Sequence, residues 1–444
     1  MMDFPEGFTW GVSTSAYQIE GATREGGRGE GIWDSFTRRP GRVADGSSGE
    51  VATDHYRRYR EDVALLAELG VGAYRFSLSW PRLQPSGRGR LNTPGLDFYR
   101  RLIDALHASG IAPWPCLYHW DLPQALQDRG GWANRDSASY LADYAAAVAE
   151  ELAGSITELL LLNEPNVHAL LGHLVGVHAP GLTGMDSYLP AVHHQNLATG
   201  LALRQVRQVA PALRLGTILN LQPVAPAEAG EEHEVAAQLV DACYNRSALD
   251  PLLLGAYPQQ LASLLEALIG SDDMAVIAQP LDLLGVNHYT RLRVLAEPSA
   301  PLGLRLAEAP LGAEVTEMGW EVAPAALSEQ LDELRLRYGN PPVYLTENGA
   351  AFADRAGASG RVEDRRRADY LTAYLRAVAD ARSRGCDVRG YFVWTLVDNF
   401  EWSHGFSRRF GLVELDLATL ERRKKRSFDV YRQIVRSGRL PGRD

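Results

Sequence analysis

Short apolar segments recur along the chain, and each is followed by a stretch with helical spacing. The apolar segments are residues 8–14, 73–80, 112–120, 157–163, 215–221, 281–289, 342–347 and 389–395. Helical spacing is seen between them, for example in Tyr59, Val63 and Leu66. Parallel strands that are covered on both faces are apolar almost throughout, so this alternation predicts a parallel α/β fold. Because eight strands can close a barrel, we expect a (β/α)8 TIM barrel with elaborated βα loops.

The length and the lack of compositional breaks favour one domain. A decorated barrel can reach 444 residues, and no low-complexity linker divides the chain. We therefore expect a single catalytic barrel domain over residues 1–444. An open doubly wound sheet is the alternative fold. It is disfavoured because the glycine-rich stretch at 26–31 follows no strand directly and opens no apolar helix.

Charge and composition exclude several classes of protein. The formal net charge is −10, whereas nucleic-acid-binding proteins usually carry a basic surface, so no nucleic-acid partner is expected. The basic cluster at 422–426 is the local exception, and we expect it to be the solvated start of a helix. No apolar run approaches the roughly 18 residues that a membrane span needs.

The cysteines and the first residues favour a cytoplasmic protein. Cys116, Cys243 and Cys386 are odd in number and far apart, which predicts neither a disulfide framework nor a zinc site. The first residues contain no basic region followed by an apolar segment, so no signal peptide is expected. The sequence leaves the oligomeric state open.

Polar and aromatic residues gather near one end of the predicted strands. They include Gln18, Arg75, His119, Trp120, Asn163, Glu164, Asn220, Asn287, Tyr289, Glu347 and Trp394, with Glu401 and Trp402 just beyond. This end is the C-terminal edge of each strand, where the active sites of barrel enzymes form. The clustering therefore predicts an enzyme.

Two glutamates indicate the reaction. Glu164 follows the apolar run 159–162, and Glu347 follows the run 343–345. Burying an unpaired carboxylate costs free energy, so packing alone does not explain a glutamate at the end of a buried strand. Two carboxylates on either side of one bond are the arrangement that glycoside hydrolysis requires.

The order of motifs resembles glycoside hydrolase family 1, the β-glucosidases and their relatives. The matching motifs are Ala16-Tyr17-Gln18-Ile19-Glu20-Gly21, Tyr74-Arg75-Phe76-Ser77, Tyr118-His119-Trp120-Asp121, Asn163-Glu164-Pro165, Asn287-His288-Tyr289, Gly319-Trp320-Glu321, Thr346-Glu347-Asn348-Gly349, Asp398-Asn399-Phe400-Glu401-Trp402 and Arg409-Phe410-Gly411. They span essentially the whole chain.

The resemblance implies a retaining β-glycosidase, and first of all a β-glucosidase acting on a small-molecule β-glycoside. By similarity Glu347 is the nucleophile and Glu164 the acid/base. Arg75 and Tyr289 would contact the nucleophile, and Asn163 would lie beside the acid/base. No metal or organic cofactor is expected, because the carboxyl groups transfer the protons themselves.

The resemblance also implies a set of substrate-binding residues. They are Gln18, His119, Trp120, Asn220, Asn287, Trp320, Trp394, Glu401, Trp402 and Phe410. Trp394 would lie against the sugar ring, and Trp320 would support the leaving group. The choice among glucose, galactose and fucose is left open.

Several alternatives stay open at this point. Asn166 and His173 depart from the family pattern, which suggests a polar or unusually shaped leaving group, such as that of a natural-product glycoside. A transglycosidase would use the same intermediate. A phospho-β-glycosidase is disfavoured because Glu401 would repel a phosphate. A non-catalytic sugar-binding protein is disfavoured because Glu164 and Glu347 are both present.

Overall fold

The computed structural model describes residues 4–354, 356–357 and 361–442. The prediction that there is no signal peptide rests partly on residues 1–3, which lie outside the described residues. In the described residues, eight parallel strands close into a barrel in the order β1-β11-β10-β7-β5-β4-β3-β2. They are β1 (Thr9–Ser13), β2 (Ala73–Ser77), β3 (Ala112–Tyr118), β4 (Glu158–Asn163), β5 (Arg214–Asn220), β7 (Leu283–Asn287), β10 (Val343–Asn348) and β11 (Val388–Trp394). Each overlaps one predicted strand. The predicted (β/α)8 barrel is confirmed, and its closure excludes an open sheet.

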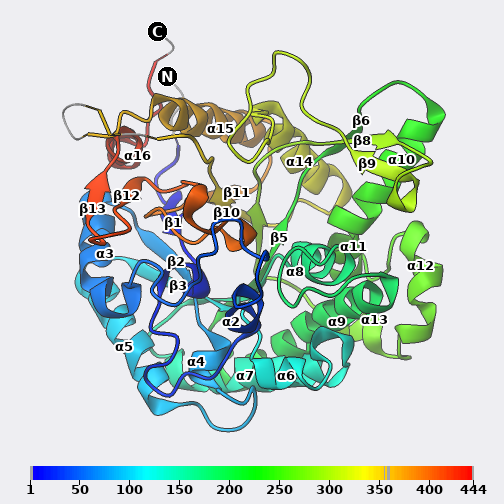
Figure 1. Cartoon of the computed structure of the whole chain (residues 1–444), viewed down its shortest axis with the longest axis horizontal. Helices are drawn as coiled ribbons and strands as arrows, with labels where there is room; N and C mark the ends of the chain where they lie inside the picture. The colour runs from blue at the N-terminus through cyan, green and yellow to red at the C-terminus, as the bar shows by residue number, and fades with distance from the viewer. Residues whose placement is uncertain (1–3, 355, 358–360, 443–444) are drawn as a thin grey trace.

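Helices surround the barrel strands (Figure 1). Those that follow the successive barrel strands are α3 (His55–Leu69), α5 (Thr93–Ala108), α7 (Asp136–Leu152), α9 (Met185–Val209), α13 (Asp273–Ile277), α14 (Pro324–Arg337), α15 (Arg365–Ser383) and α16 (Arg426–Ser437). The other helices lie in the loops: α1 (Ala16–Ile19), α2 (Ile32–Thr37), α4 (Trp80–Leu83), α6 (Gln124–Gln127), α8 (Pro165–Ala169), α10 (Glu231–Asp241), α11 (Ser247–Leu253) and α12 (Gln259–Leu265). Within the described residues, none of the helices combines the length and apolarity needed to cross a membrane.

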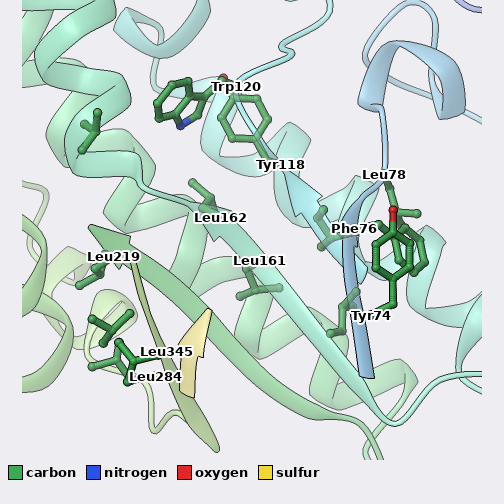
Figure 2. Packing of buried hydrophobic residues seen from close by; sticks show 14 of the residues in the cluster. Tyr74, Phe76, Leu78, Tyr118, Trp120, Leu161, Leu162, Leu219, Leu284 and Leu345 are labelled. Atoms are coloured by element: carbon green, nitrogen blue, oxygen red, sulfur yellow. The ribbon is translucent and has the colours of Figure 1, made fainter. Parts of the chain in front are cut away.

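Side chains alternate between the inside of the barrel and the layer under the helices. Those that pack together inside the barrel are Ala73, Trp114, Cys116, Leu160, Ile218, Leu283, Tyr344 and Phe392. The intervening residues, such as Tyr74, Leu161 and Leu345, join the larger core between strands and helices, part of which is drawn in Figure 2. Strand alternation thus divides the apolar runs between two cores.

Irregular pairing interrupts this alternation on the two strands that carry the predicted catalytic glutamates. The register of β4 against β5 shifts between Leu160 and Asn163. The register of β10 shifts between Leu345 and Glu347 against β7, and between Leu345 and Asn348 against β11. A bulge re-aims the side chains that follow it. On both strands the shift comes just before the polar residues that lie at the C-terminal end of the barrel.

Several βα loops contain additional structure. The loop after β4 holds α8 and a π-helical turn, Leu170–Leu174; the loop after β5 holds α10, α11, α12 and a second π-helical turn, Ala242–Arg246. A small sheet joins β6 (Val224–Pro226), β8 (Leu292–Ala296) and β9 (Leu304–Leu306). A hairpin pairs β12 (Val413–Leu415) with β13 (Arg422–Lys424). The elaborated βα loops are therefore confirmed.

The expectation of a solvated helix start at 422–426 is wrong. Helix α16 begins at Arg426, and β13 occupies 422–424. Arg422 forms an ion pair with the buried Asp62. Lys425 is fully buried, and its Nζ donates to Asp354 at 2.7 Å and to Asp398 at 2.9 Å. Charge patterning alone could not show that two of these cations have buried partners far away in the sequence.

Replacing Lys425 with alanine should destabilise the protein strongly. The variant would leave Asp398 buried beside Asp354 without their shared cation, and breaking a buried ion pair costs about 3 kcal/mol or more. The free energy of unfolding, measured by urea denaturation, would show the loss. Lys424→Ala is the matched control, because the partly exposed pair with Glu68 contributes less than about 1 kcal/mol. Equal losses in the two variants would contradict the structural role of Lys425.

Candidate active site

A cavity of about 750 Å³ lies at the C-terminal ends of the barrel strands. The predicted site residues that line it are His119, Trp120, Glu164, Asn220, Tyr289, Trp320, Glu347, Trp394, Glu401, Trp402 and Phe410. The other four predicted residues do not line the cavity, but each forms a hydrogen bond to a residue that does; they are Gln18, Arg75, Asn163 and Asn287. The structure thus brings the whole predicted set together in one place.

Glu347 lies at the end of β10 with two strong partners. The buried guanidinium of Arg75, on β2, donates from Nη1 to Glu347 Oε1. The hydroxyl of Tyr289 donates to Oε2 at 2.5 Å. Burial raises the pKa of Glu347, while Arg75 and Tyr289 counteract the increase because they stabilise the ionised form. Glu347 is therefore placed to act as a carboxylate.

Glu164 has a different environment, although it lies in the same cavity. It directly follows β4 and precedes α8, and its backbone has a positive φ of 47°, a strained conformation for a residue with a side chain. Oε1 accepts from the amides of Asn220 at 2.8 Å and Asn287 at 2.7 Å. Burial, together with the negative charge of Glu347, raises the pKa of Glu164 to about 8. Glu164 therefore holds a proton at neutral pH.

Asn163 connects the two carboxyl groups to His119. Its Oδ1 accepts from Arg75 Nη2 at 2.6 Å and from Asn287 Nδ2 at 3.0 Å. Its Nδ2 donates to His119 Nε2 at 3.0 Å, which leaves the proton of the neutral ring on Nδ1. Burial, and then Arg75, lower the pKa of His119 well below its ordinary value. Among the described residues, none forms a hydrogen bond with His119 Nδ1, so this nitrogen is left to donate to a ligand.

Glu401 supplies a third carboxyl group. Gln18 Nε2 donates to Glu401 Oε2 at 3.4 Å, and it is held in place by a 2.8 Å bond to the carbonyl oxygen of Phe400. Burial raises the pKa of Glu401 to about 8, and the charges of Glu347 and Glu164 add to the increase. A neutral or ionised carboxyl in this position can accept hydrogen bonds from several hydroxyl groups.

Aromatic side chains form the walls of the inner cavity. The ring of His119 lies 6.1 Å from that of Trp394 and 5.8 Å from that of Trp402. On another side, Tyr289 packs with Trp394 and Phe410, and Trp320 packs against them. Flat apolar rings beside carboxyl groups suit a sugar, whose ring has apolar C–H faces and a polar rim of hydroxyl groups.

Comparison with known proteins identifies the family. A family model described as glycosyl hydrolase family 1 matches residues 1–439. The chain belongs to glycosyl hydrolase family 1.

Individual members of family 1 match over nearly the full chain. Beta-glucosidase A of Acetivibrio thermocellus is 42% identical over 440 residues, which cover 98% of each chain. A bifunctional beta-D-glucosidase/beta-D-fucosidase of Bifidobacterium breve is 43% identical over 459 residues, again covering 98% of each. Among solved structures, a family 1 b-glucosidase from Thermotoga maritima superposes with a TM-score of 0.96 at 41% identity and covers both chains completely.

The structure adds residues that the sequence reasoning for this family 1 protein missed. Tyr244, in the second π-helical turn, lines the cavity and donates to Asn220 Oδ1 at 3.0 Å. Gln222 donates to the same oxygen at 2.6 Å and accepts from the backbone nitrogen of Thr290. Neither residue ends a strand. No signal in the single sequence could have placed Tyr244 here, because its loop folds back over the barrel.

Asn166 and His173 do not face the cavity of this family 1 protein. Asn166 is buried, and its amide donates to the carbonyl oxygens of Asn220 and Tyr244 at 2.8 Å. His173 is buried with Nδ1 2.8 Å from Ser187 Oγ. These two positions therefore give no support for a polar leaving group.

Replacing Glu401 with glutamine should stabilise the ligand-free protein. The pKa of Glu401 rises from an ordinary 4.5 to about 8 on folding, so the folded state binds this proton more tightly and stability falls as the pH rises through that interval. Glu401→Gln removes the ionisation and should increase the free energy of unfolding at pH 8 by at least about 2 kcal/mol. The gain should shrink towards pH 5.

The control for this measurement is Glu150→Gln, a substitution of an exposed glutamate on α7. It should leave the free energy of unfolding unchanged at both pH values. A Glu401→Gln gain that does not grow with pH would contradict the assigned origin of the stabilisation.

Proposed function

We propose that the protein is a retaining β-glucosidase that hydrolyses terminal β-D-glucosyl residues of small-molecule glycosides. The observation that carries the proposal is the unequal pair of carboxyl groups in one cavity: Glu347 held by Arg75, and Glu164 protonated between neutral amides. Two carboxyl groups with different proton affinities are what acid-assisted displacement requires.

In the first step Glu164 acts as general acid and Glu347 as nucleophile. Glu347 attacks the anomeric carbon while the bond from that carbon to the leaving oxygen breaks. Glu164 transfers its proton to this oxygen, so the leaving group departs as a neutral alcohol. The products are a glycosyl ester of Glu347 and an ionised Glu164.

In the second step Glu164 acts as general base. Esterification removes the negative charge of Glu347, which contributes to the raised pKa of Glu164. Glu164 is then stable as a carboxylate and accepts a proton from water as the water oxygen attacks the anomeric carbon. The ester bond breaks, and Glu347 regains its carboxylate and its ion pair with Arg75.

The position of Asn287 supports retention of configuration. Asn287 is the register partner of Glu347 across β7 and β10, and its amide donates to Glu164 at 2.7 Å, so both carboxyl groups lie beside one residue. A nucleophile that attacks directly requires carboxyl groups about 5–5.5 Å apart, whereas inverting enzymes separate theirs by about 6.5–9.5 Å to admit a water molecule.

The inner cavity provides the groups that hold the sugar. His119 Nδ1 would donate to one hydroxyl, Glu401 would accept from others, and Trp394 would lie against a ring face. The lining groups are held in orientation by hydrogen bonds from three side chains outside the lining, Gln18, Asn163 and Asn287. We propose a fucosyl group as a second glycone, since a 43% identical relative is named for both glucosidase and fucosidase activities.

The comparisons favour hydrolysis over the alternatives considered from the sequence. The relatives are named beta-glucosidases, and none of those described above is named a transglycosidase. The match over residues 1–439 supports the proposal that the chain is one catalytic domain. A cytoplasmic location stays a prediction from the sequence.

Glu347→Ala should remove measurable activity, because no glycosyl ester can form. Glu164→Ala should lower kcat/KM by about 10²–10⁴ for a glucoside with a poor leaving group. The decrease in kcat/KM should be much smaller for 2,4-dinitrophenyl β-D-glucoside, because its leaving group needs no proton. Steady-state rates on the two substrates would show the difference. Full activity of Glu347→Ala would overturn the assignment.

The covalent intermediate can also be trapped directly. Incubation with 2,4-dinitrophenyl 2-deoxy-2-fluoro-β-D-glucoside should add one fluoroglucosyl group, and mass spectrometry should locate it on the peptide that contains Glu347. The same label in Glu164→Ala would serve as the control, since that variant retains the nucleophile. A label on any other residue would be incompatible with the proposed nucleophile.

The pH dependence should follow the proton on Glu164. Since the general acid works only when protonated, kcat/KM should fall as the pH rises through the pKa of about 8. In Glu164→Ala, measured on 2,4-dinitrophenyl β-D-glucoside, this alkaline decline should disappear. An unchanged decline in the variant would assign it to another group and would speak against Glu164 as the acid.

A further inference from the structure

The cavity has two chemically distinct parts. Among its described lining residues, the acidic side chains are Glu164, Glu347 and Glu401, all in the inner part, and none of the lining residues is a lysine or an arginine. The outer part is lined mostly by leucines and valines. Representative members are Leu171, Leu174, Leu239, Leu264, Leu292 and Leu306. One continuous cavity therefore passes from a polar site into an aliphatic channel.

The aliphatic channel is built by loop segments that lie far apart in the sequence. The π-helical turn Leu170–Leu174 contributes Leu171 and Leu174, α10 contributes Leu239, and α12 contributes Leu264. The small sheet contributes residues from β8 and β9. Figure 1 shows α10, α12 and this sheet on the same side of the barrel. Four separate segments each place apolar side chains on one channel.

The rim of the channel exposes these apolar side chains to solvent. Leu264 is 50% exposed and Leu306 is 57% exposed. Isolated exposed leucines are ordinary, but apolar side chains that line a groove leading into a site indicate a ligand surface. An apolar ligand group that covered these side chains would remove their surface from water, and the favourable free energy of this burial grows with the area covered.

The leaving group of a bound glucoside would enter this channel. Glu164, which protonates the leaving oxygen, immediately precedes α8, and α8 continues directly into the turn that carries Leu171. The groups suited to the sugar, Glu401 and Trp394, belong to β11 and the loop after it. The aliphatic wall therefore begins a few residues beyond the proton donor. A second sugar there would place hydroxyl groups against leucines with few hydrogen-bond partners, which is unfavourable.

We propose that the preferred substrates are β-glucosides of long, uncharged aliphatic alcohols, whose alkyl chain occupies the channel. This inference rests on the proposed β-glucosidase function and names its substrate class. The reaction is hydrolysis: water and the alkyl β-glucoside give glucose and the free alcohol, with the proton supplied by Glu164.

A series of alkyl β-D-glucosides from ethyl to octyl tests the proposal. The acidity of the alcohol hardly changes along the series, so differences in kcat/KM report contacts made by the chain. Each added methylene should raise kcat/KM about two- to fourfold, for a total of at least about 50-fold, when all substrates are kept below micellar concentrations. A flat series, or a higher kcat/KM for cellobiose than for octyl glucoside, would overturn the proposal.

Substitutions at the rim test whether the dependence of kcat/KM on alkyl chain length arises from the channel. In the double variant Leu264→Ser/Leu306→Ser, kcat/KM for octyl glucoside should fall about tenfold, while that for ethyl glucoside should change less than twofold. Both side chains are already half exposed, so the fold should tolerate the change. Leu311→Ser is the matched control, since Leu311 is fully exposed and does not line the cavity. Equal loss on both substrates, or no loss, would count against the channel.

β-D-Glucosyl fluoride separates this inference from the function on which it rests. Its leaving group is a single atom and cannot reach the channel. If the fluoride is not hydrolysed, the proposed β-glucosidase function fails. If the fluoride is hydrolysed normally and the alkyl series is flat, only the inference about the leaving group fails.

Discussion

The ion pair between the buried guanidinium of Arg75 and Glu347 organises the floor of the cavity. Arg75 also donates to Asn163, which in turn contacts His119 and Asn287. Because a buried carboxylate is costly without a partner, the ionised state of Glu347 depends on this cation. Glu164 and Glu401 receive hydrogen bonds from neutral amides instead, and they feel the charge of Glu347. One guanidinium thus makes Glu347 different from the two carboxyl groups beside it.

Much of the fold and the inner site could be predicted from the sequence, because both follow from the geometry of buried parallel strands. Apolar runs marked the barrel strands with small errors at their ends; the run 73–80, for example, continues past β2, which ends at Ser77. Polar residues at the ends of these runs, such as Arg75, Asn287 and Glu347, had to meet at one edge of the barrel. The family motifs then assigned them separate roles.

The remaining features depend on contacts that local patterns do not encode. The register shifts before Asn163 and Glu347 come from pairing with neighbouring strands. Lys425 looked like one of five solvated cations, but its two partners lie 27 and 71 residues earlier in the chain. The wall that includes Leu171 and Tyr244 is made by loops, whose course over the barrel no periodicity predicts. Asn166, which departs from the family pattern, turned out to fill the protein interior.

Closure of the barrel has a consequence for synthesis of the protein on the ribosome. Strand β1 pairs with β11, so Ser13 must meet Trp394, which is 381 positions later. At about 5–20 residues per second, translation takes roughly 20–80 s to cover that interval. Throughout this time one side of the first strand has no partner, and it offers unpaired amide and carbonyl groups to other nascent chains on the same messenger RNA. Native pairing protects that edge only after the last barrel strand has emerged, and this delay is a direct consequence of the topology.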